Sequence, residues 1–290
     1  MNRLLKISSG RILFVSDIQG NLEDFDQILS AFKTLRLQGK ADFLVIGGDL
    51  VHGYPGYRDH SFHLLGRMKE LMEKDSSIIF LMGNHELSHV LHWKLRKGNL
   101  SFVEGLEQEM AGQREDYARF LSSLPFGIIS GGGVLLMHTG PSLKLSLLEP
   151  AKADDRLVWD WFWNLDFQQS LETGPIPLEI FDPDFGSRFL QTTQGEFLWE
   201  AFMNKNEFQI VNYPGVLTKF LKNFSPKASF LVSGHIPVAE GALKIAGKQL
   251  RICTSYGARD KSSKKMLIVD AARSYSSLEE VERGLKGLFG

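Results

Sequence analysis

Cysteine, long apolar runs and a secretory leader pattern are scarce or missing from this sequence, and each absence excludes a class of protein. The one cysteine, Cys253, can form neither an internal disulfide nor a cysteine zinc cluster. The longest apolar runs, Ile12–Val15 and Ile78–Met82, are far shorter than the roughly 18 residues of a membrane-spanning helix. The N-terminal residues MNRLLKISSG lack the apolar stretch of a secretory signal. We therefore expect a cytoplasmic protein with no membrane partner.

An excess of charge of either sign is also missing. Lys and Arg total 33 and Asp and Glu total 34, which gives a formal net charge of −1. A nucleic acid polymer is therefore not an expected partner. The 290 residues, 43% of them hydrophobic, are enough for a large core, and we predict one domain over residues 1–290. With one thiol, any metal ion must be held by Asp, Asn, Gln, Glu or His side chains.

The first half of the chain alternates between predicted strands and helices. Short runs of β-forming residues are followed each time by apolar residues at helical spacing. The predicted strands are Ile12–Ser16, Phe43–Ile46 and Ile78–Met82, and the predicted helices span 22–35, 62–72 and 87–96. Strand and helix alternation of this kind indicates a largely parallel sheet that is covered on both faces.

The second half predicts a different pattern. Gly131–Gly133 separates two strands of a hairpin, and three later strands indicate an antiparallel second sheet. Residues 143–226 contain several prolines and the aromatic cluster Trp159–Trp163, which we expect to pack in the core. We predict that this stretch is an irregular insertion facing the substrate. The strands are Gly127–Ser130, Val134–His138, Ser229–Ser233, Ala242–Ile245, Gln249–Thr254 and Met266–Val269, and a closing helix is predicted over Glu279–Leu288.

Polar residues next to glycine follow five of the predicted strands. Ligands of open α/β sheets bind just beyond the carboxyl ends of the strands, and glycine lets side chains from several strands approach one point. Such an inventory suits two divalent cations that share a carboxylate, with Mn, Fe or Zn preferred for mixed nitrogen and oxygen donors. Two such ions serve phosphoester hydrolysis. The clusters begin at Asp17, Gly48, Gly83, His138 and Gly234.

The order D-x-[H/Q]-G-N, G-D, G-N-H-E, H-T-G, G-H-x-P resembles the calcineurin-like metallophosphoesterase superfamily. The G-N-H-E form, the order and the chain length resemble its phosphoprotein-phosphatase branch, including bacterial members and their dinucleoside-polyphosphatase relatives. The resemblance implies a four-layer αββα sandwich, in which two mixed sheets are flanked by helices. It also implies a phosphatase whose substrate is a phosphoprotein, a nucleotide or a small phosphoester.

The resemblance implies a role for each strand-end residue. A metal-bridging hydroxide would attack phosphorus with no covalent intermediate, and His85 would protonate the leaving oxygen as general acid. Position 19 usually holds histidine in this family, and here a neutral amide oxygen favours Mn²⁺ over Zn²⁺, with Fe as another candidate metal. The alternative is a site that binds only one metal well. The implied ligands are Asp17 and Gln19 for the first metal, Asp49 bridging both, and Asn84, His138 and His235 for the second.

The second motif departs from the branch pattern G-D-x-V-D-R-G. It runs from Gly48 to Gly53 and has His52 where the pattern has the Asp of an Asp-Arg pair. In the family that Asp orients the general acid and that Arg binds phosphate. His52, Arg58 and Asn84 are the candidates here for contact with the substrate phosphate, and Arg156, Arg188 and Arg259 are further ones. The missing pair also leaves open a phosphate-binding regulatory module that does not turn over.

A competing motif overlaps the third cluster. His85-Glu86-Leu87-Ser88-His89 matches the zinc-protease pattern H-E-x-x-H, which needs both imidazoles on one helix face. That interpretation explains none of the other four clusters and needs His85 well inside a helix. Because Gly83 and Asn84 directly follow an apolar strand, we place His85 at a helix start. His89 and His92 are then ordinary helix-face residues.

Overall fold

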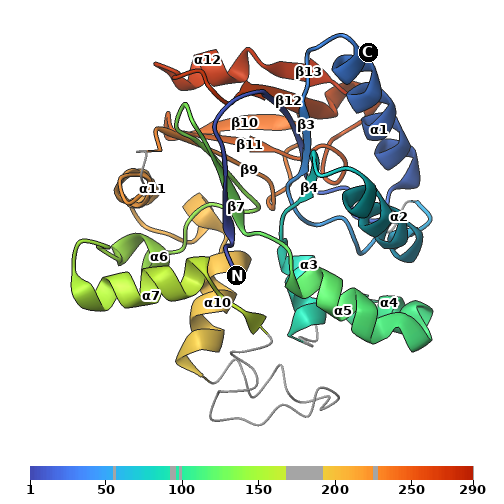
Figure 1. The fold of residues 1–290 in the computed structure, drawn as a ribbon, viewed down its shortest axis with the longest axis horizontal. Coiled ribbons are helices and arrows are strands. Elements are labelled where there is room, and N and C mark those ends of the chain that lie inside the picture. The colour runs from blue at the N-terminus through green and yellow to red at the C-terminus, as the bar shows by residue number, and fades with distance from the viewer. Residues whose placement is uncertain (55–56, 92–95, 98–99, 168–191, 225–227, 290) are drawn as a thin grey trace.

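Two mixed β-sheets lie face to face, with helices on both outer sides (Figure 1). This computed structural model describes the chain except residues 55–56, 92–95, 98–99, 168–191, 225–227 and 290. The arrangement confirms the predicted α/β sandwich of two mixed sheets flanked by helices. None of the described helices is both long enough and apolar enough to cross a membrane.

The first sheet has five strands, and its centre is parallel. β2 pairs with β3 and β3 with β4 in parallel, while β12 runs antiparallel to both β2 and β13. The polar residues after β2, β3 and β4 therefore meet at one edge of this sheet. In sheet order the strands are β13 (Leu285–Gly287), β12 (Lys265–Asp270), β2 (Arg11–Val15), β3 (Phe43–Ile46) and β4 (Ile78–Phe80).

The second sheet has six strands and brings two more strand ends to the same place. β8, β9 and β11 are parallel, and the triple-glycine turn joins β7 to β8 as an antiparallel hairpin, as predicted. In sheet order the strands are β1 (Leu4–Ile7), β7 (Gly127–Ser130), β8 (Val134–Met137), β9 (Phe230–Ser233), β11 (Gln249–Ile252) and β10 (Ala242–Ile245). A separate two-stranded ribbon joins β5 (Arg96–Lys97) to β6 (Leu100–Ser101).

Alternation along β2 shows how the layers form. Ile12 and Phe14 belong to the buried cluster between the two sheets, whereas Leu13 and Val15 belong to the cluster under the helices. Successive side chains of a strand point to opposite faces, so a strand that is apolar at every position is buried on both. The apolar run from Ile12 to Val15 in β2 therefore requires a layer on each side of its sheet.

Helices cover the two outer faces. α1 (Leu22–Leu37) and α2 (Ser61–Lys74) lie beside the β2–β3–β4 side, and α6 (Leu143–Leu147), α7 (Ala153–Trp163) and α11 (Tyr213–Leu221) lie on the opposite side (Figure 1). Asn21 caps α1 by accepting the N–H of Asp24 at 3.1 Å, which ends the turn after β2. The other α-helices in the described part of the chain are α3 (Asn84–Val90), α4 (Phe102–Met110), α5 (Arg114–Ser122), α10 (Thr193–Met203) and α12 (Leu278–Glu282).

Four expectations from the sequence are wrong. The second sheet is mixed rather than antiparallel, because β8, β9 and β11 run parallel to one another. The strand predicted at Met266–Val269 is β12, which joins the first sheet because its partner is β2 rather than β11. The closing helix stops at Glu282 and is followed by β13; a Cβ at Gly284 would lie 2.1 Å from the carbonyl oxygen of Ile268, so this close turn needs glycine. The third helix begins at Asn84 and ends at Val90, well before residue 96.

The stretch predicted as irregular is helical where the structure describes it. Between residues 143 and 226 it holds α6, α7, α10 and α11, with residues 168–191 and 225–226 outside the described part. Trp159, Phe162 and Trp163 form the buried stripe of α7, which confirms their place in the core. The assignment of one domain with a substrate-facing insertion stays a prediction.

Candidate metal centre

The polar residues at the strand ends converge above the joint edge of the two sheets. Asp17 follows β2, Asp49 follows β3, Asn84 follows β4, His138 follows β8 and His235 follows β9. All of these side chains except that of His235 are almost fully buried, and the His235 side chain is half-buried. The two sheets thus bring these five predicted site residues to one point.

The backbone is strained at several residues of the site. Several of the residues have φ in the left-handed region, which costs a residue with a Cβ free energy and persists only where the surroundings impose it. Gly48, at φ +94°, allows one close approach within the site, because a Cβ there would lie 2.6 Å from His138 Nδ1 and 2.8 Å from Gly83 Cα. The residues with a Cβ and left-handed φ at the site are Asp17 (56°), Gln19 (46°), Asp49 (53°), His52 (71°) and His235 (72°).

Four donor atoms meet at the spacing expected around one cation. Asn84 Oδ1 lies 2.9 Å from both His138 Nε2 and His235 Nδ1, and these two nitrogens are 3.2 Å apart. Asp49 Oδ1 lies 3.3 Å from His138 Nε2. Ligands of a tetrahedral ion at about 2.0–2.2 Å stand about 3.3 Å from one another. Asp49, His138 and His235 each offer one ligand atom, and the three atoms lie within 4.8 Å of one another, close enough to hold one metal ion.

The orientation of His138 fits a metal ligand. Its Nδ1 lies 2.9 Å from the carbonyl oxygen of Gly47, which can only accept, so Nδ1 carries the proton and Nε2 points at oxygen acceptors. Burial opposes charge on this imidazole, but the carboxylates of Asp49 and Asp17 outweigh it and raise the pKa of His138. A proton and a metal ion therefore compete for Nε2.

The amide of Asn84 and the imidazole of His235 complete this half of the site. Turning the amide over would place its nitrogen against His138 Nε2 and His235 Nδ1, whereas a cation requires the oxygen inward. Burial, followed by the neighbouring His138, lowers the pKa of His235 to about 3, so this imidazole is neutral and able to coordinate. Both side chains fit a divalent ion.

The other half of the site is made of oxygen donors. Asp17 accepts the N–H of His235 with both carboxylate oxygens, at 3.1 and 3.0 Å, and burial raises its pKa to about 6. Gln19 Nε2 lies 3.5 Å from Asp49 Oδ2, while Gln19 Oε1 is buried with no hydrogen-bond partner among the described residues. A buried acceptor without a partner is costly, and a cation offsets that cost. Asp17, Gln19 and Asp49 therefore fit a second ion.

His85 stands at the edge of this cluster rather than in it. It is the second residue of α3, and its Nε2 lies 3.8 Å from Asp49 Oδ2. Its backbone N–H donates to Asp49 Oδ1 at 3.1 Å. The start of α3 thus holds the His85 imidazole beside Asp49, at the helix start that the sequence predicted.

Glu86 has a role that the sequence analysis did not assign. Its buried carboxylate accepts four backbone N–H groups at 2.8–3.3 Å, three from the loop after β3 and one from the turn after β4. Burial, then the charge of Asp49, raises the pKa of Glu86 to about 7. The position of Glu86 three residues after Gly83, the residue that caps α3, was the available signal. Glu86 fixes the loop that carries Asp49.

His52 and His89 also differ from expectation. His89 is buried, and its Nε2 lies 2.7 Å from His52 Nε2, so it is not an ordinary helix-face residue. The ring of His52 packs on that of His85 with 4.9 Å between centroids. The pairing of His89 with His52 also places it away from the metal-ligand cluster, against the zinc-protease interpretation. His92 lies outside the described residues.

The predicted phosphate-binding arginines do not gather at the cluster. Arg58 is exposed on the loop before α2. Arg156 pairs with Asp160 on α7. Arg259 pairs with Glu240 and lines the pocket beside the cluster that is described next. Arg188 lies outside the described residues. Of the three phosphate-contact candidates, Asn84 lies in the cluster and Arg58 is exposed on its loop. The ring of His52 packs against that of His85.

One pocket adjoins this centre, and another lies apart from it. The first, of about 300 Å³, adjoins it: Tyr54 stacks on Tyr256 with 4.0 Å between ring centroids and lies 6.5 Å from the ring of His85. Tyr57 also lines this pocket and donates from its hydroxyl to the carbonyl oxygen of Gln19 at 2.6 Å. We call Tyr54, Tyr57 and Tyr256 the tyrosine pocket.

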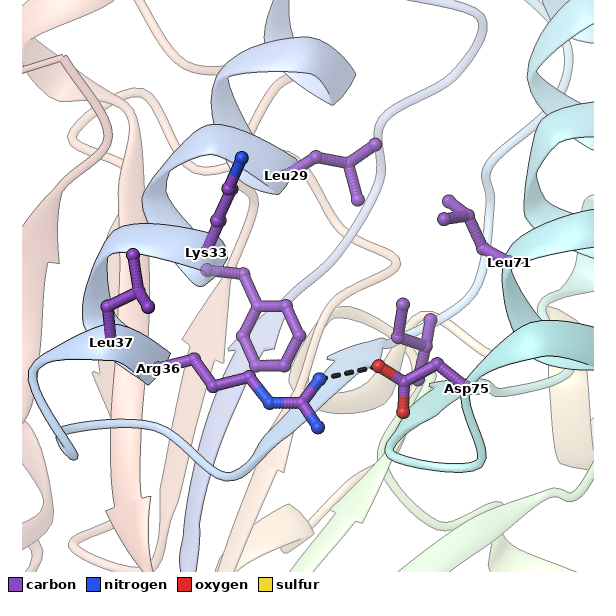
Figure 2. Close-up of a pocket in the computed structure, with 8 residues that line it drawn as sticks. Leu29, Lys33, Arg36, Leu37, Leu71 and Asp75 are labelled. Atoms are coloured by element: carbon purple, nitrogen blue, oxygen red, sulfur yellow. Dashed lines mark hydrogen bonds and ion pairs between the residues drawn. The ribbon is translucent and has the colours of Figure 1, made fainter.

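The second pocket, of about 360 Å³, lies between α1 and the end of α2 (Figure 2). Its wall is mostly apolar, with Leu29, Leu37 and Leu71 around an ion pair of 2.5 Å between Arg36 and Asp75 (Figure 2). None of the predicted site residues lines it, so it is separate from the candidate metal centre.

Comparisons with known proteins agree with the fold. A family model described as calcineurin-like phosphoesterase matches residues 10–239. No curated protein matches the chain. A cold-active protein tyrosine phosphatase from a psychrophilic Shewanella species is 18% identical with a TM-score of 0.58, over 94% of this chain and 78% of that one. A protein serine/threonine phosphatase from Saccharomyces cerevisiae is 15% identical with a TM-score of 0.54, over 98% of this chain and 82% of that one. At these identities the likeness to the two structures establishes the fold.

Proposed function

The chain belongs to the calcineurin-like phosphoesterase family, and from that premise we propose that it hydrolyses phosphoesters at a centre of two divalent metal ions. The observation that carries the proposal is the meeting of Asn84 Oδ1, His138 Nε2 and His235 Nδ1 within 3.2 Å of one another, next to Asp49. These atoms are acceptors that face one another, and a cation is the group that such an arrangement stabilises.

The two ions would share Asp49. One would be held by Asp17, Gln19 and Asp49, and the other by Asp49, Asn84, His138 and His235. The amide oxygen of Gln19 in place of an imidazole favours Mn²⁺, with Fe or Zn as the other candidates. When bound, such ions polarise the phosphoryl oxygens and make a water molecule acidic enough to attack at neutral pH.

The chain's own residues orient the substrate and move a proton. His85 would donate the proton on Nε2 to the leaving oxygen, and its place beside Asp49 puts that nitrogen at the rim of the cluster. Asn84 would contact both a metal ion and the phosphate. Glu86 would act through the backbone, because its four N–H bonds fix the loop that presents Asp49.

The substrate class that we propose first is a phosphoprotein, on the order and form of the sequence motifs. The tyrosine pocket favours a second candidate, a nucleotide or dinucleoside polyphosphate, because stacked aromatic rings beside the phosphate site suit a planar base. A phosphotyrosine side chain would use the same rings, so the pocket also accommodates the first class.

The test is a screen in Mn²⁺ over p-nitrophenyl phosphate, phosphopeptides, nucleotides and dinucleoside polyphosphates. We expect turnover by the wild-type protein and a loss of at least about 10³-fold in Asp49→Asn, which removes the shared charge. Asp154→Asn is the matched control, because Asp154 is exposed in the first turn of α7, a helix on the outer side of the molecule (Figure 1). Wild-type protein that binds Mn²⁺ and phosphate without turnover would support the regulatory module instead, and an active Asp49→Asn would contradict the two-metal site.

A further inference from the structure

The ring of His85 hydrogen-bonds to a main-chain carbonyl group. The G-D-x-V-D-R-G pattern would instead provide a side-chain carboxylate as its partner. His85 Nδ1 lies 3.2 Å from the carbonyl oxygen of Val51. A carbonyl oxygen only accepts, so Nδ1 carries a proton and Nε2 is left to face Asp49 and the substrate side. The carbonyl of Val51 thereby fixes the tautomer and the direction of the His85 ring.

The same peptide group is held from its other end. The N–H of His52, which belongs to the peptide bond with Val51, donates to Ser61 Oγ at 2.6 Å. The hydroxyl of Ser61 in turn donates to Asp59 Oδ1 at 2.5 Å, and the Ser61 backbone N–H donates to the same oxygen at 2.9 Å. Hydrogen bonds thus connect the Asp59 carboxylate, through Ser61 and one peptide group, to the His85 imidazole.

The side chain of His52 holds this peptide in place but does not supply the charge of a carboxylate. Its backbone has φ +71°, and its ring is fixed between His89, whose Nε2 lies 2.7 Å away, and Phe102, which stacks at 5.4 Å. Burial, with the nearby His89 and His85, lowers the pKa of His52 well below its ordinary value, so the ring is neutral.

We propose that the Val51–His52 peptide, held by Ser61 and Asp59, replaces the side-chain carboxylate that orients the general-acid histidine, which makes Ser61 and Asp59 positioning residues. This inference rests on the phosphoester hydrolysis proposed above. In that step the oxygen of water bonds to phosphorus as the bond to the leaving oxygen breaks. The leaving oxygen keeps the electron pair of the broken bond and takes the proton from His85 Nε2. The attacking water loses one proton to solvent, and solvent returns a proton to Nε2 for the next turnover. The proton on Nδ1 stays on the ring, hydrogen-bonded to the carbonyl oxygen of Val51.

The test compares substrates with good and poor leaving groups. Ser61→Ala removes the acceptor for the His52 N–H, so we expect kcat/KM for phenyl phosphate to fall about tenfold or more and that for p-nitrophenyl phosphate to fall less than about threefold. A nitrophenolate leaves with little need of a proton, so it reports on everything except the general acid. Thermal unfolding of each variant shows whether it is folded.

The chain offers a matched control in a second turn of the same kind. Ser77 donates from its hydroxyl to Asp75 Oδ1 at 2.6 Å and from its N–H at 2.9 Å, in a turn after α2 that contacts none of the cluster residues described above. Ser77→Ala loses the same hydroxyl bond, and we expect it to leave both substrates unaffected. If Ser61→Ala does not fold, Asp59→Ala tests the same path from an exposed residue and should show the same selective loss, at smaller size.

A double-mutant cycle separates positioning from a general structural effect. In a His85→Asn background, Ser61→Ala should have no further effect on phenyl phosphate, because the residue through which it acts is gone. Equal losses on both substrates, or a full Ser61→Ala effect in that background, would overturn the proposal. An inactive wild type, or a His85→Asn variant that loses both substrates equally, would show that the proposed chemistry itself had failed.

Discussion

Replacement of Gly48 by alanine should damage the metal centre through a single methyl group. Gly48 has φ +94°, where a residue with a Cβ costs about 1–2 kcal/mol more than glycine. The added Cβ would also lie 2.6 Å from His138 Nδ1 and 2.8 Å from Gly83 Cα. Relief of those contacts requires movement of His138, of the turn that carries Asn84, or of both, at about 1–3 kcal/mol more.

Gly39→Ala provides the comparison. Gly39 follows α1 at φ +63°, and none of the described residues comes within 4 Å of a Cβ placed there. Its substitution carries the conformational cost alone, about 1–2 kcal/mol. The difference between the two variants therefore isolates the close approach of the main chain to His138.

Urea unfolding and Mn²⁺ titration calorimetry measure the two consequences. We expect Gly48→Ala to lose about 2–5 kcal/mol of unfolding free energy in total and to bind Mn²⁺ about 10–100-fold more weakly, as follows when a ligand imidazole is displaced. Gly39→Ala should bind Mn²⁺ like the wild type. Equal Mn²⁺ affinity in both variants would refute the argument that Gly48 sets the position of His138.

Three further outcomes follow from the same structure. Glu86→Gln replaces one acceptor oxygen by a donor and leaves two of four buried N–H groups without an acceptor. Urea unfolding should therefore show a loss of about 2–4 kcal/mol in unfolding free energy, and an unchanged urea midpoint would contradict this. Cys253 is fully buried and burial raises its thiol pKa well above the ordinary value, so a thiol reagent should label it only after denaturation, and fast labelling of native protein would count against this. Addition of Mn²⁺ at 100 times its Kd to chelator-treated protein should add about 2.7 kcal/mol of stability and raise Tm, an increase that Asp49→Asn should largely abolish.

The convergence of these side chains was predictable because its signal is local. A short apolar run followed by Gly and then Asp, Asn or His identifies a strand end, and parallel strands bring their ends to one edge. Asp49 and His138 lie 89 positions apart in the sequence, yet each is marked by its own neighbours. The same reasoning placed His85 at the start of a helix.

The remaining features depend on contacts that the sequence does not mark. The apolar residues of β12 fit either sheet equally well, and only pairing with β2 decides between them. His89 has the spacing of a helix-face residue, and its contact with His52 arises from the position of α3 against the loop after β3. The role of Ser61 similarly depends on a backbone N–H of His52, a group that every residue except proline carries.

The pairing of β2 also has a consequence for synthesis of the chain on the ribosome. β2 is hydrogen-bonded on both sides, to β3 and to β12. On the β12 side, Phe14 pairs with Leu267. At about 5–20 residues per second, roughly 10–50 s pass between translation of these two residues. Throughout that time one edge of a strand with four consecutive apolar residues has no partner from its own chain, which is the condition under which nascent chains aggregate. We expect early synthesis of this protein to depend on factors that shield exposed strands.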